Sequence, residues 1–210
     1  MGYSLDPVSA NCYPNTTVLE NRFNIREQSK LDEVESVITT ARIAEWLHSP
    51  KADSFDFSHY KQVHNYIFKD LYDWAGQVRT INISKKGTVF CPADEIEAQG
   101  KKIFGRLASV HFFVGLSYGS FLEELADFYC AVNYLHPFRE GNGRTQRVFL
   151  SQLAEYAGFR LDFSTIDTDL LMLATIQSAH GVTDLLKRVL GDAVSELYCK
   201  SAALPPNPPQ

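Results

Sequence analysis

Residues 119–135 carry apolar side chains at helical spacing for about four turns, and the pattern stops abruptly at His136-Pro137. The apolar positions are Phe121, Leu122, Leu125, Phe128, Tyr129, Val132 and Leu135. Because a stripe this broad must be covered by other elements, the pattern predicts a central helix. Glycines at 141 and 143 then predict a turn, and a new helix is expected to begin between Asn142 and Arg144.

Helical periodicity recurs along most of the chain. The other expected helices are 27–48, 57–76, 93–109, 144–158, 167–179 and 182–198. Residues 78–90 alternate instead around a KKG turn, which predicts a short surface hairpin, or flap. His64 lies on the apolar stripe of its helix, so a core histidine is favoured over a ligand. The sequence therefore predicts a mainly α fold, a helical bundle with a central helix-loop-helix motif and one β-hairpin flap.

One domain over residues 26–198 is expected, because 210 residues suffice for a single well-filled core. Residues 1–25 lack sustained periodicity and are interpreted as an extended lead-in packed on that domain. Residues 199–210 are rich in proline and are expected to be disordered.

Composition excludes several classes of protein. With 45% hydrophobic and 21% charged residues, the chain is typical of soluble globular proteins, and its apolar runs are too short to cross a membrane. The start lacks a secretory signal, so a cytoplasmic location is expected. A net charge of −5 disfavours direct, sequence-independent binding to nucleic acid. The four cysteines are widely spaced, which favours reduced thiols over a zinc site or disulfide framework.

The loop HPFREGNGRTQR, residues 136–147, combines features of an anion site. Free amide groups at a helix start bind anions, and Gly141 and Gly143 allow a phosphate to approach the backbone closely. Arg144 and Arg147 are three residues apart, so both guanidinium groups can project from one helical face. Together with Arg139 they form a small basic pocket. This arrangement favours a polyphosphate over a single carboxylate.

Glu140 and His136 of the loop are candidates for metal binding and for proton transfer. Glu140 is the only acid of the loop, and Mg²⁺ commonly takes one or two protein carboxylates together with phosphates and water. His136 is suited to accept a proton from an attacking hydroxyl near neutral pH. The residues therefore predict a magnesium nucleotide site with an adjacent base, although HPF could simply end a helix and GNG could simply form a turn.

The loop resembles the signature of the Fic family, in which a histidine, a phenylalanine, an acid, GNGR and a further arginine recur in this order. The segment HNYIFKDLYDWAGQVRTINISKKGTVF is similar to the helix and flap of that family. The lead-in NCYPNTTVLENRFNI resembles that of bacterial Fic toxins. The resemblance implies a Fic fold and an enzyme that transfers AMP from Mg-ATP to a hydroxyl of a target protein, a protein adenylyltransferase.

The resemblance also implies roles for individual residues. His136 would deprotonate the target hydroxyl, Phe138 would anchor the loop in the core, and Glu140 would hold Mg²⁺. The remaining assignments are an α-phosphate cradle of Gly141, Asn142 and Gly143, outer-phosphate contacts from Arg144 and Arg147, a target-docking flap at Lys86, Gly87 and Thr88, and Gln177 as a candidate on the adenine side.

Many Fic proteins are inhibited by a helix with the pattern S/T-x-x-x-E-G/N. The stretch Thr16 to Asn21, with Glu20, matches these letters but lies in the irregular lead-in. We therefore expect inhibition in trans by a small antitoxin that carries such a helix, which makes this chain the toxin of a toxin-antitoxin pair. By resemblance alone, the target could be DNA gyrase or topoisomerase IV.

Two other functions remain open from the sequence. The same loop could transfer a different phosphate-containing group if the nucleotide bound in another orientation. A third hypothesis is that the protein is a non-catalytic module that binds a partner protein.

Overall fold

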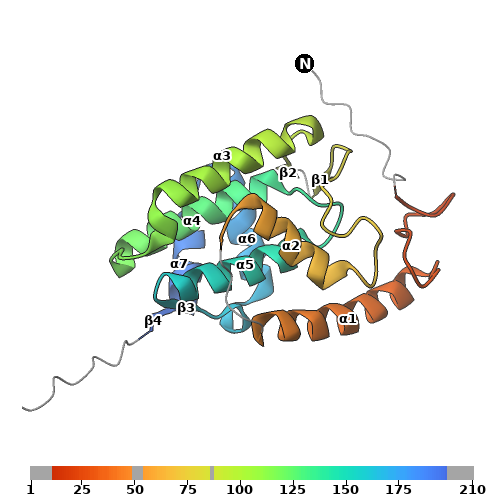
Figure 1. The fold of residues 1–210 in the computed structure, drawn as a ribbon. Helices are drawn as coiled ribbons and strands as arrows, with labels where there is room; N and C mark the ends of the chain where they lie inside the picture. The colour runs from red at the N-terminus through yellow and green to blue at the C-terminus, as the bar shows by residue number, and fades with distance from the viewer. Residues whose placement is uncertain (1–10, 49–53, 86–87, 198–210) are drawn as a thin grey trace, which may run out of the picture.

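The structure, a computed structural model, describes residues 11–48, 54–85 and 88–197. Within these ranges the chain forms seven α-helices and two small antiparallel sheets (Figure 1). The helices are α1 Gln28–His48, α2 Phe57–Phe68, α3 Ile96–Ser109, α4 Tyr118–Leu135, α5 Asn142–Tyr156, α6 Thr168–Ala179 and α7 Asp184–Ala193. No described helix combines the length and apolar character needed to cross a bilayer.

Helices α4 and α5 form the centre of the bundle, as the sequence predicts. Ser117 caps the start of α4, where its Oγ accepts a hydrogen bond from the Ser120 amide (3.3 Å). The side chains of Phe121, Leu125 and Leu135 on α4 are fully buried. Helix α3 packs on α4 from one side, α6 and α7 pack on it from another, and α2 lies against α5. The loop between α4 and α5 is therefore held on a rigid scaffold.

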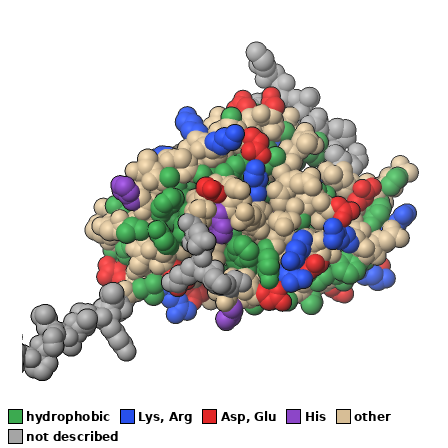
Figure 2. Space-filling model, in the orientation of Figure 1, with side chains coloured by type: hydrophobic (Ala, Val, Ile, Leu, Met, Phe, Trp, Pro, Cys, Tyr) green, Lys and Arg blue, Asp and Glu red, His purple; other side chains and the backbone are tan. Residues whose placement is uncertain are grey.

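Helix α1 lies along one edge of the bundle, against α2 and α5 (Figure 1). Only Leu31 and Thr39 of its residues are buried, so most of its surface faces solvent. On the face drawn in Figure 2, acidic and basic side chains are interspersed over the surface.

Helix α2 ends earlier than the expected boundary at Gly76. Asp56 caps its start by accepting a hydrogen bond from the His59 amide (2.7 Å), and the helix stops at Phe68. The chain then turns, and the Gly76 amide donates to Nδ1 of His64 (2.8 Å). This contact folds residues 69–76 back over α2, so the apolar pattern of these residues reflects core packing and not continued helix.

The flap is a hairpin, but a shorter one than residues 78–90 suggest. Its strands are β1 Ser84–Lys85 and β2 Thr88–Val89, which pair antiparallel. A second two-stranded sheet was not expected: β3 Phe159–Leu161 pairs antiparallel with β4 Val194–Glu196, which follows α6 and α7 in the chain. The prediction of a helix over 182–198 is therefore wrong after Ala193, because the chain leaves α7 to pair with β3. Three short 3-10 helices complete the fold: Ala93–Glu95, His111–Phe113 and Phe163–Thr165.

The described part of the lead-in is irregular. Residues 11–25 hold one isolated bridge, between Cys12 and Leu19, and the Arg22 amide bonds to the carbonyl of Leu71 (2.9 Å). Cys12 and Cys91 are buried thiols and Cys130 is a half-buried one. The expected disordered tail at 199–210, the first ten residues of the lead-in, and Cys199 lie outside the described residues.

Candidate active site

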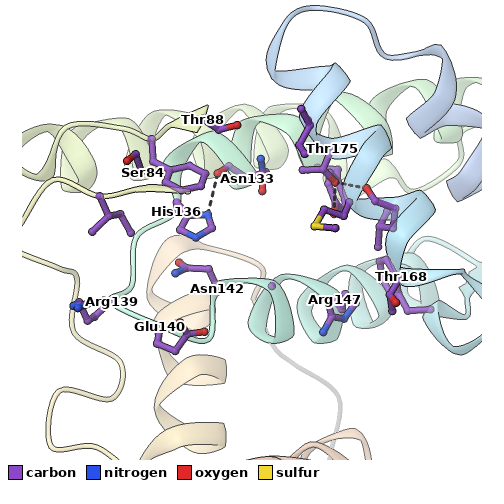
Figure 3. A pocket seen from close by; sticks show the side chains of 18 of the residues that line it. Ser84, Thr88, Asn133, His136, Arg139, Glu140, Asn142, Arg147, Thr168 and Thr175 are labelled. Carbon is purple, nitrogen blue, oxygen red and sulfur yellow. Dashed lines mark hydrogen bonds between the residues drawn. The ribbon is translucent and has the colours of Figure 1, made fainter. Parts of the chain in front are cut away.

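A cavity of about 510 Å³ lies between the flap, the α4–α5 loop and α6 (Figure 3). The flap and α4 form one wall, and the start of α5 forms another. Figure 3 shows His136 opposite Asn142 and Glu140 at one end, with Arg147, Thr168 and Thr175 at the other. The lining is Ile81, Asn82, Ile83, Ser84, Thr88, Phe90, Tyr129, Asn133, His136, Arg139, Glu140, Asn142, Gly143, Arg147, Phe163, Ile166, Thr168, Leu171, Met172, Thr175 and Ile176.

His136 ends helix α4 in a left-handed backbone conformation, with φ 39° and ψ 59°. A non-glycine residue rarely adopts this conformation, so neighbouring contacts must hold it. Its amide still closes the last helical bond, to the carbonyl of Val132 (3.1 Å). The turn directs the half-buried imidazole into the cavity.

The contacts of the His136 ring select its tautomer. Nδ1 lies 3.3 Å from the carbonyl oxygen of Asn133, which can only accept a hydrogen bond. Nδ1 must therefore carry the proton in this contact. The ring also stacks on Phe90 of the flap, with centroids 3.7 Å apart. The role of His136 as a general base stays a prediction.

The loop after His136 is fixed by Phe138 and Asn142. The Phe138 ring is fully buried and stacks on the rings of His64 (3.8 Å) and Tyr60 (5.6 Å). Asn142 bonds the backbone of Phe138 twice: its Oδ1 accepts from the Phe138 amide (2.9 Å) and its Nδ2 donates to the Phe138 carbonyl (2.8 Å). Both polar atoms of the Asn142 side chain therefore form hydrogen bonds within the loop. The group of Asn142 that can bind an anion is its backbone amide.

Helix α5 begins directly at this loop. Gly141 has φ +80°, and the first helical bond runs from the Thr145 amide to its carbonyl (3.1 Å). The amides of Asn142, Gly143 and Arg144 therefore lie in the first turn, where a helix supplies no acceptors. Gly143 is exposed at the cavity, and the positive end of the helix dipole is directed there. This is the geometry of an anion site.

Of the two arginines Arg144 and Arg147, only Arg147 belongs to the cavity lining. Arg147 lines the cavity, and no ion pair of Arg147 occurs within the part of the chain that the structure describes. Burial, followed by the positive charge of Arg144, lowers its pKa from the ordinary value. A half-buried cation without a carboxylate partner favours an anionic ligand.

Arg144 does not line the cavity. Its guanidinium turns toward α1, where it pairs with Glu35 (2.5 Å) and bonds Oγ1 of Thr39 (3.3 Å). The expectation that both arginines project into one site is therefore not met, because a partly buried carboxylate on α1 holds Arg144. Its assignment to phosphate binding stays a prediction.

Glu140 lies at the edge of the anion site with a side chain that is 45% exposed. Its Oε1 accepts from the Gly141 amide (2.8 Å) and lies 3.6 Å from Arg144. Among the described residues, no three histidine, cysteine or acidic side chains gather around a common point that could hold a metal. One accessible carboxylate beside an anion site fits Mg²⁺ bound jointly with phosphates.

His64 is the core histidine that the sequence predicts. It is fully buried, and because Nδ1 accepts from the Gly76 amide, Nε2 must donate to the carbonyl of Glu140 (3.0 Å). Burial lowers its pKa to about 3. A neutral imidazole therefore supports the loop from inside the core.

The far end of the cavity is mostly apolar. Phe163, Ile166, Met172 and Ile176 line it, and the Tyr129 hydroxyl bonds Oγ1 of Thr175 (3.2 Å). A flat apolar base would fit such a surface. Gln177 is outside this lining, because the helix directs Thr175 and Ile176 to the cavity instead.

The flap residues can be followed only in part. Thr88 lines the cavity, whereas Lys86 and Gly87 lie outside the described residues. The stretch Thr16–Asn21 forms a turn and the bridge strand, not a helix, and Glu20 is exposed. The absence of helix here is consistent with the interpretation of this stretch as lead-in.

Two supports of the site were missed from the sequence. Arg79, at the root of the flap, bonds the carbonyl of His136, and Glu35 on α1 pairs with Arg144. Their partners are 57 and 109 positions away, so local patterns carry no signal of either contact.

Comparison with known proteins identifies the family of the chain. A sequence profile of the Fic/DOC family matches residues 54–154. The chain is 42% identical over 171 residues to a Sinorhizobium fredii protein described as "Probable protein adenylyltransferase y4lH", covering 81% of this chain and 88% of that one. It is 35% identical over 184 residues to "Probable protein adenylyltransferase Fic" of Escherichia coli, covering 88% and 91%. The chain belongs to the Fic/DOC family.

Solved structures show the same architecture. The BepC protein of Bartonella tribocorum, crystallised with AMPPNP, matches with a TM-score of 0.85 and 27% identity, covering 90% of this chain and 97% of that one. The N-terminal Fic domain of a Bep effector of Bartonella quintana, with bound ADP, matches with a TM-score of 0.84 and 28% identity, covering 89% and 95%. Both structures hold an adenine nucleotide. The predicted Fic fold is thereby confirmed.

Proposed function

We propose that this protein transfers AMP from Mg-ATP to a hydroxyl side chain of a target protein and releases pyrophosphate. The observation that carries the proposal is the position of His136. Its ring, oriented by the contact of Nδ1 with the Asn133 carbonyl, lines a cavity that also contains the start of α5 and Arg147, a cation with no carboxylate partner among the described residues. The relatives described as protein adenylyltransferases support the same activity.

In the proposed reaction the target hydroxyl gives its proton to Nε2 of His136 as its oxygen attacks the α-phosphorus of ATP. A new oxygen–phosphorus bond forms, and the bond to the leaving pyrophosphate breaks. Amide groups of the first turn of α5 hold the α-phosphate where charge develops, and Arg147 binds the outer phosphates. A positioned base contributes roughly 10²–10⁴-fold to such a step.

Glu140 is the residue that would hold Mg²⁺. When bound, the ion would neutralise phosphate charge and help orient the pyrophosphate group for departure. The bond from the Gly141 amide keeps the Glu140 carboxylate at the edge of the cavity, and the bond from His64 to the Glu140 carbonyl fixes the backbone beneath it.

We further propose that the chain acts as a toxin that a separate small antitoxin inhibits, and that the flap at Lys86, Gly87 and Thr88 docks the target. Support for the first point is the irregular Thr16–Asn21 stretch, which forms no helix. Support for the second is the position of Thr88, which belongs to strand β2 of the hairpin and lines the cavity. Type II topoisomerases are candidate targets by resemblance.

The test is to incubate the purified protein with a cell lysate, Mg²⁺ and ATP labelled on either the α- or the γ-phosphate. Label from the α-phosphate alone, with a mass increase of one AMP on a hydroxyl residue, is the expected result. Label from the γ-phosphate would indicate transfer of a different group. Nucleotide binding without any labelling would support a non-catalytic module.

A further inference from the structure

The guanidinium group of Arg79 joins three separate segments beneath the flap. The side chain is only 5% exposed. Its Nε donates to the carbonyl of His136 (2.9 Å), its Nη1 to Ile81 (2.6 Å), and its Nη2 to Cys91 (2.5 Å). Ile81 lies on the flap arm before β1 and Cys91 on the arm after β2. One side chain therefore links both arms of the flap to the residue at the end of α4.

These partners are unusual for a buried cation. Only backbone carbonyls accept from Arg79, and no carboxylate pairs with it among the residues that the structure describes. Burial lowers its pKa from the ordinary value. Burying a charge without a carboxylate partner costs free energy of folding. A neutral side chain could make a purely structural contact here at a lower cost. The planar fork of arginine, however, can reach three carbonyls at fixed angles.

The contacts converge on the backbone that sets the direction of the His136 ring. The Arg79 amide also donates to the carbonyl of Pro137 (2.8 Å), so one residue binds two consecutive carbonyls after α4. From the other flap arm, the Cys91 amide donates to the carbonyl of Tyr134 (2.9 Å), and Phe90 stacks on the ring itself. The contacts from Arg79, Cys91 and Phe90 together stabilise the left-handed backbone conformation of His136.

We propose that Arg79 is a positioning residue that locks the orientation of the His136 imidazole to the base of the flap. The proposed general base is then held by both described arms of the flap, through Ile81 on one arm and Cys91 on the other. This inference rests on the proposed function, because His136 is the base only if the protein transfers AMP. Arg79 does not line the cavity, so its effect reaches the reaction through His136.

The experiment compares Arg79→Met and Arg79→Lys with the matched control Arg42→Met. Arg42 is a half-buried arginine of α1 that pairs with Asp70 and Glu45, away from the cavity. Three quantities are measured for each variant: the ¹⁵N chemical shifts of the His136 ring, the affinity for Mg-ATP, and the rate of α-phosphate labelling of lysate proteins. The ring shifts report the tautomer and need no transfer activity.

In the wild type the shifts should show a proton fixed on Nδ1. Arg79→Met should average the two tautomers and slow labelling by about 10- to 100-fold, while the Mg-ATP Kd changes by less than about threefold. Arg79→Lys, which keeps the charge without the fork, should lie between the two. Arg42→Met should leave the ring shifts and labelling unchanged.

Unchanged His136 shifts in a folded Arg79→Met protein would overturn the inference, and so would a fall in Mg-ATP affinity that parallels the fall in labelling. If Arg79→Met does not fold, Arg79→Lys decides by the same readouts. A wild type with a fixed tautomer but no labelling would count against the proposed function alone, and the shifts would still test the role of Arg79.

Discussion

His64 donates a hydrogen bond from Nε2 to the backbone carbonyl of Glu140 across 3.0 Å, while its Nδ1 accepts from the Gly76 amide. The bond from Gly76 requires the neutral ring, because a protonated Nδ1 cannot accept, and burial lowers the pKa of His64 to about 3. A core side chain of α2 thereby holds the loop that carries the proposed metal ligand. His64 therefore belongs to the core and also supports the loop of the site.

The His64 contact predicts how stability depends on pH. The unfolded chain binds a proton at His64 near pH 6.5, whereas the folded chain does not until about pH 3. The free energy of unfolding should therefore fall as pH drops from 6.5 toward 3, by up to about 1.4 kcal/mol per pH unit from this residue. Urea unfolding between pH 4.5 and 7.5 measures the slope.

His64→Gln should be less stable than wild type at pH 7 but should lose less stability per pH unit below 6.5. Burial also lowers the pKa of His59, so part of the slope should remain in this variant. An identical slope in both proteins would show that His64 is protonated in the folded state.

Gly141 and Gly143 should respond differently to alanine, although both belong to the same motif. At Gly141 the added Cβ would lie 2.3 Å from Cζ of Phe68, in a backbone with φ +80°. Gly141→Ala should therefore destabilise the fold by about 2 kcal/mol or more. At Gly143 the nearest atom is Nη1 of Arg147, at 3.4 Å.

Gly143→Ala should therefore keep or raise stability, by up to about 1 kcal/mol from helix propensity, and should weaken Mg-ATP binding because its methyl group enters the anion site. Thermal melts and calorimetric titration with Mg-ATP measure the two effects separately. Equal affinity in Gly143→Ala and wild type would argue that the phosphates do not approach this turn.

The sequence predicts those features whose cause is local. Apolar periodicity and the His136-Pro137 stop locate α4, and the glycines locate the start of α5, because each signal lies within the element itself. The end of α2 is missed because the apolar pattern continues past Phe68, and the bond from Gly76 to His64 that closes the turn joins residues twelve positions apart.

Contacts between distant segments account for the other differences. The strand after Ala193 depends on pairing with Phe159–Leu161, which no periodicity in residues 194–196 reveals. Spacing alone allows Arg144 and Arg147 to share a face, but Glu35, 109 positions earlier, holds Arg144 away from the cavity. The motif in residues 136–147 therefore predicts where the site lies, but it does not predict that the Arg144 side chain points away from the cavity.

The separation of the two arginines gives a third prediction. Arg147→Met removes a half-buried cation from the cavity and should weaken Mg-ATP binding by about 10- to 100-fold, the worth of a charged hydrogen bond, with little loss of stability. Arg144→Met leaves Glu35 partly buried without its cation and should instead lower stability, by about 3 kcal/mol.

The matched control is the double variant Glu35→Gln with Arg144→Met. Removing the uncompensated carboxylate should restore part of the stability lost in Arg144→Met. A larger loss of Mg-ATP affinity in Arg144→Met than in Arg147→Met would mean that Arg144 leaves Glu35 to bind phosphate.

We expect His136 to act as the base beside a site that binds Mg-ATP without a contribution from the His136 side chain. The most direct measurement compares His136→Ala with wild type in two assays on the same preparation, calorimetric Mg-ATP binding and α-phosphate labelling of lysate proteins. For His136→Ala we expect a Kd within about threefold of wild type and labelling that falls by roughly 10²–10⁴-fold. Labelling at the wild-type rate by His136→Ala would contradict this role of His136.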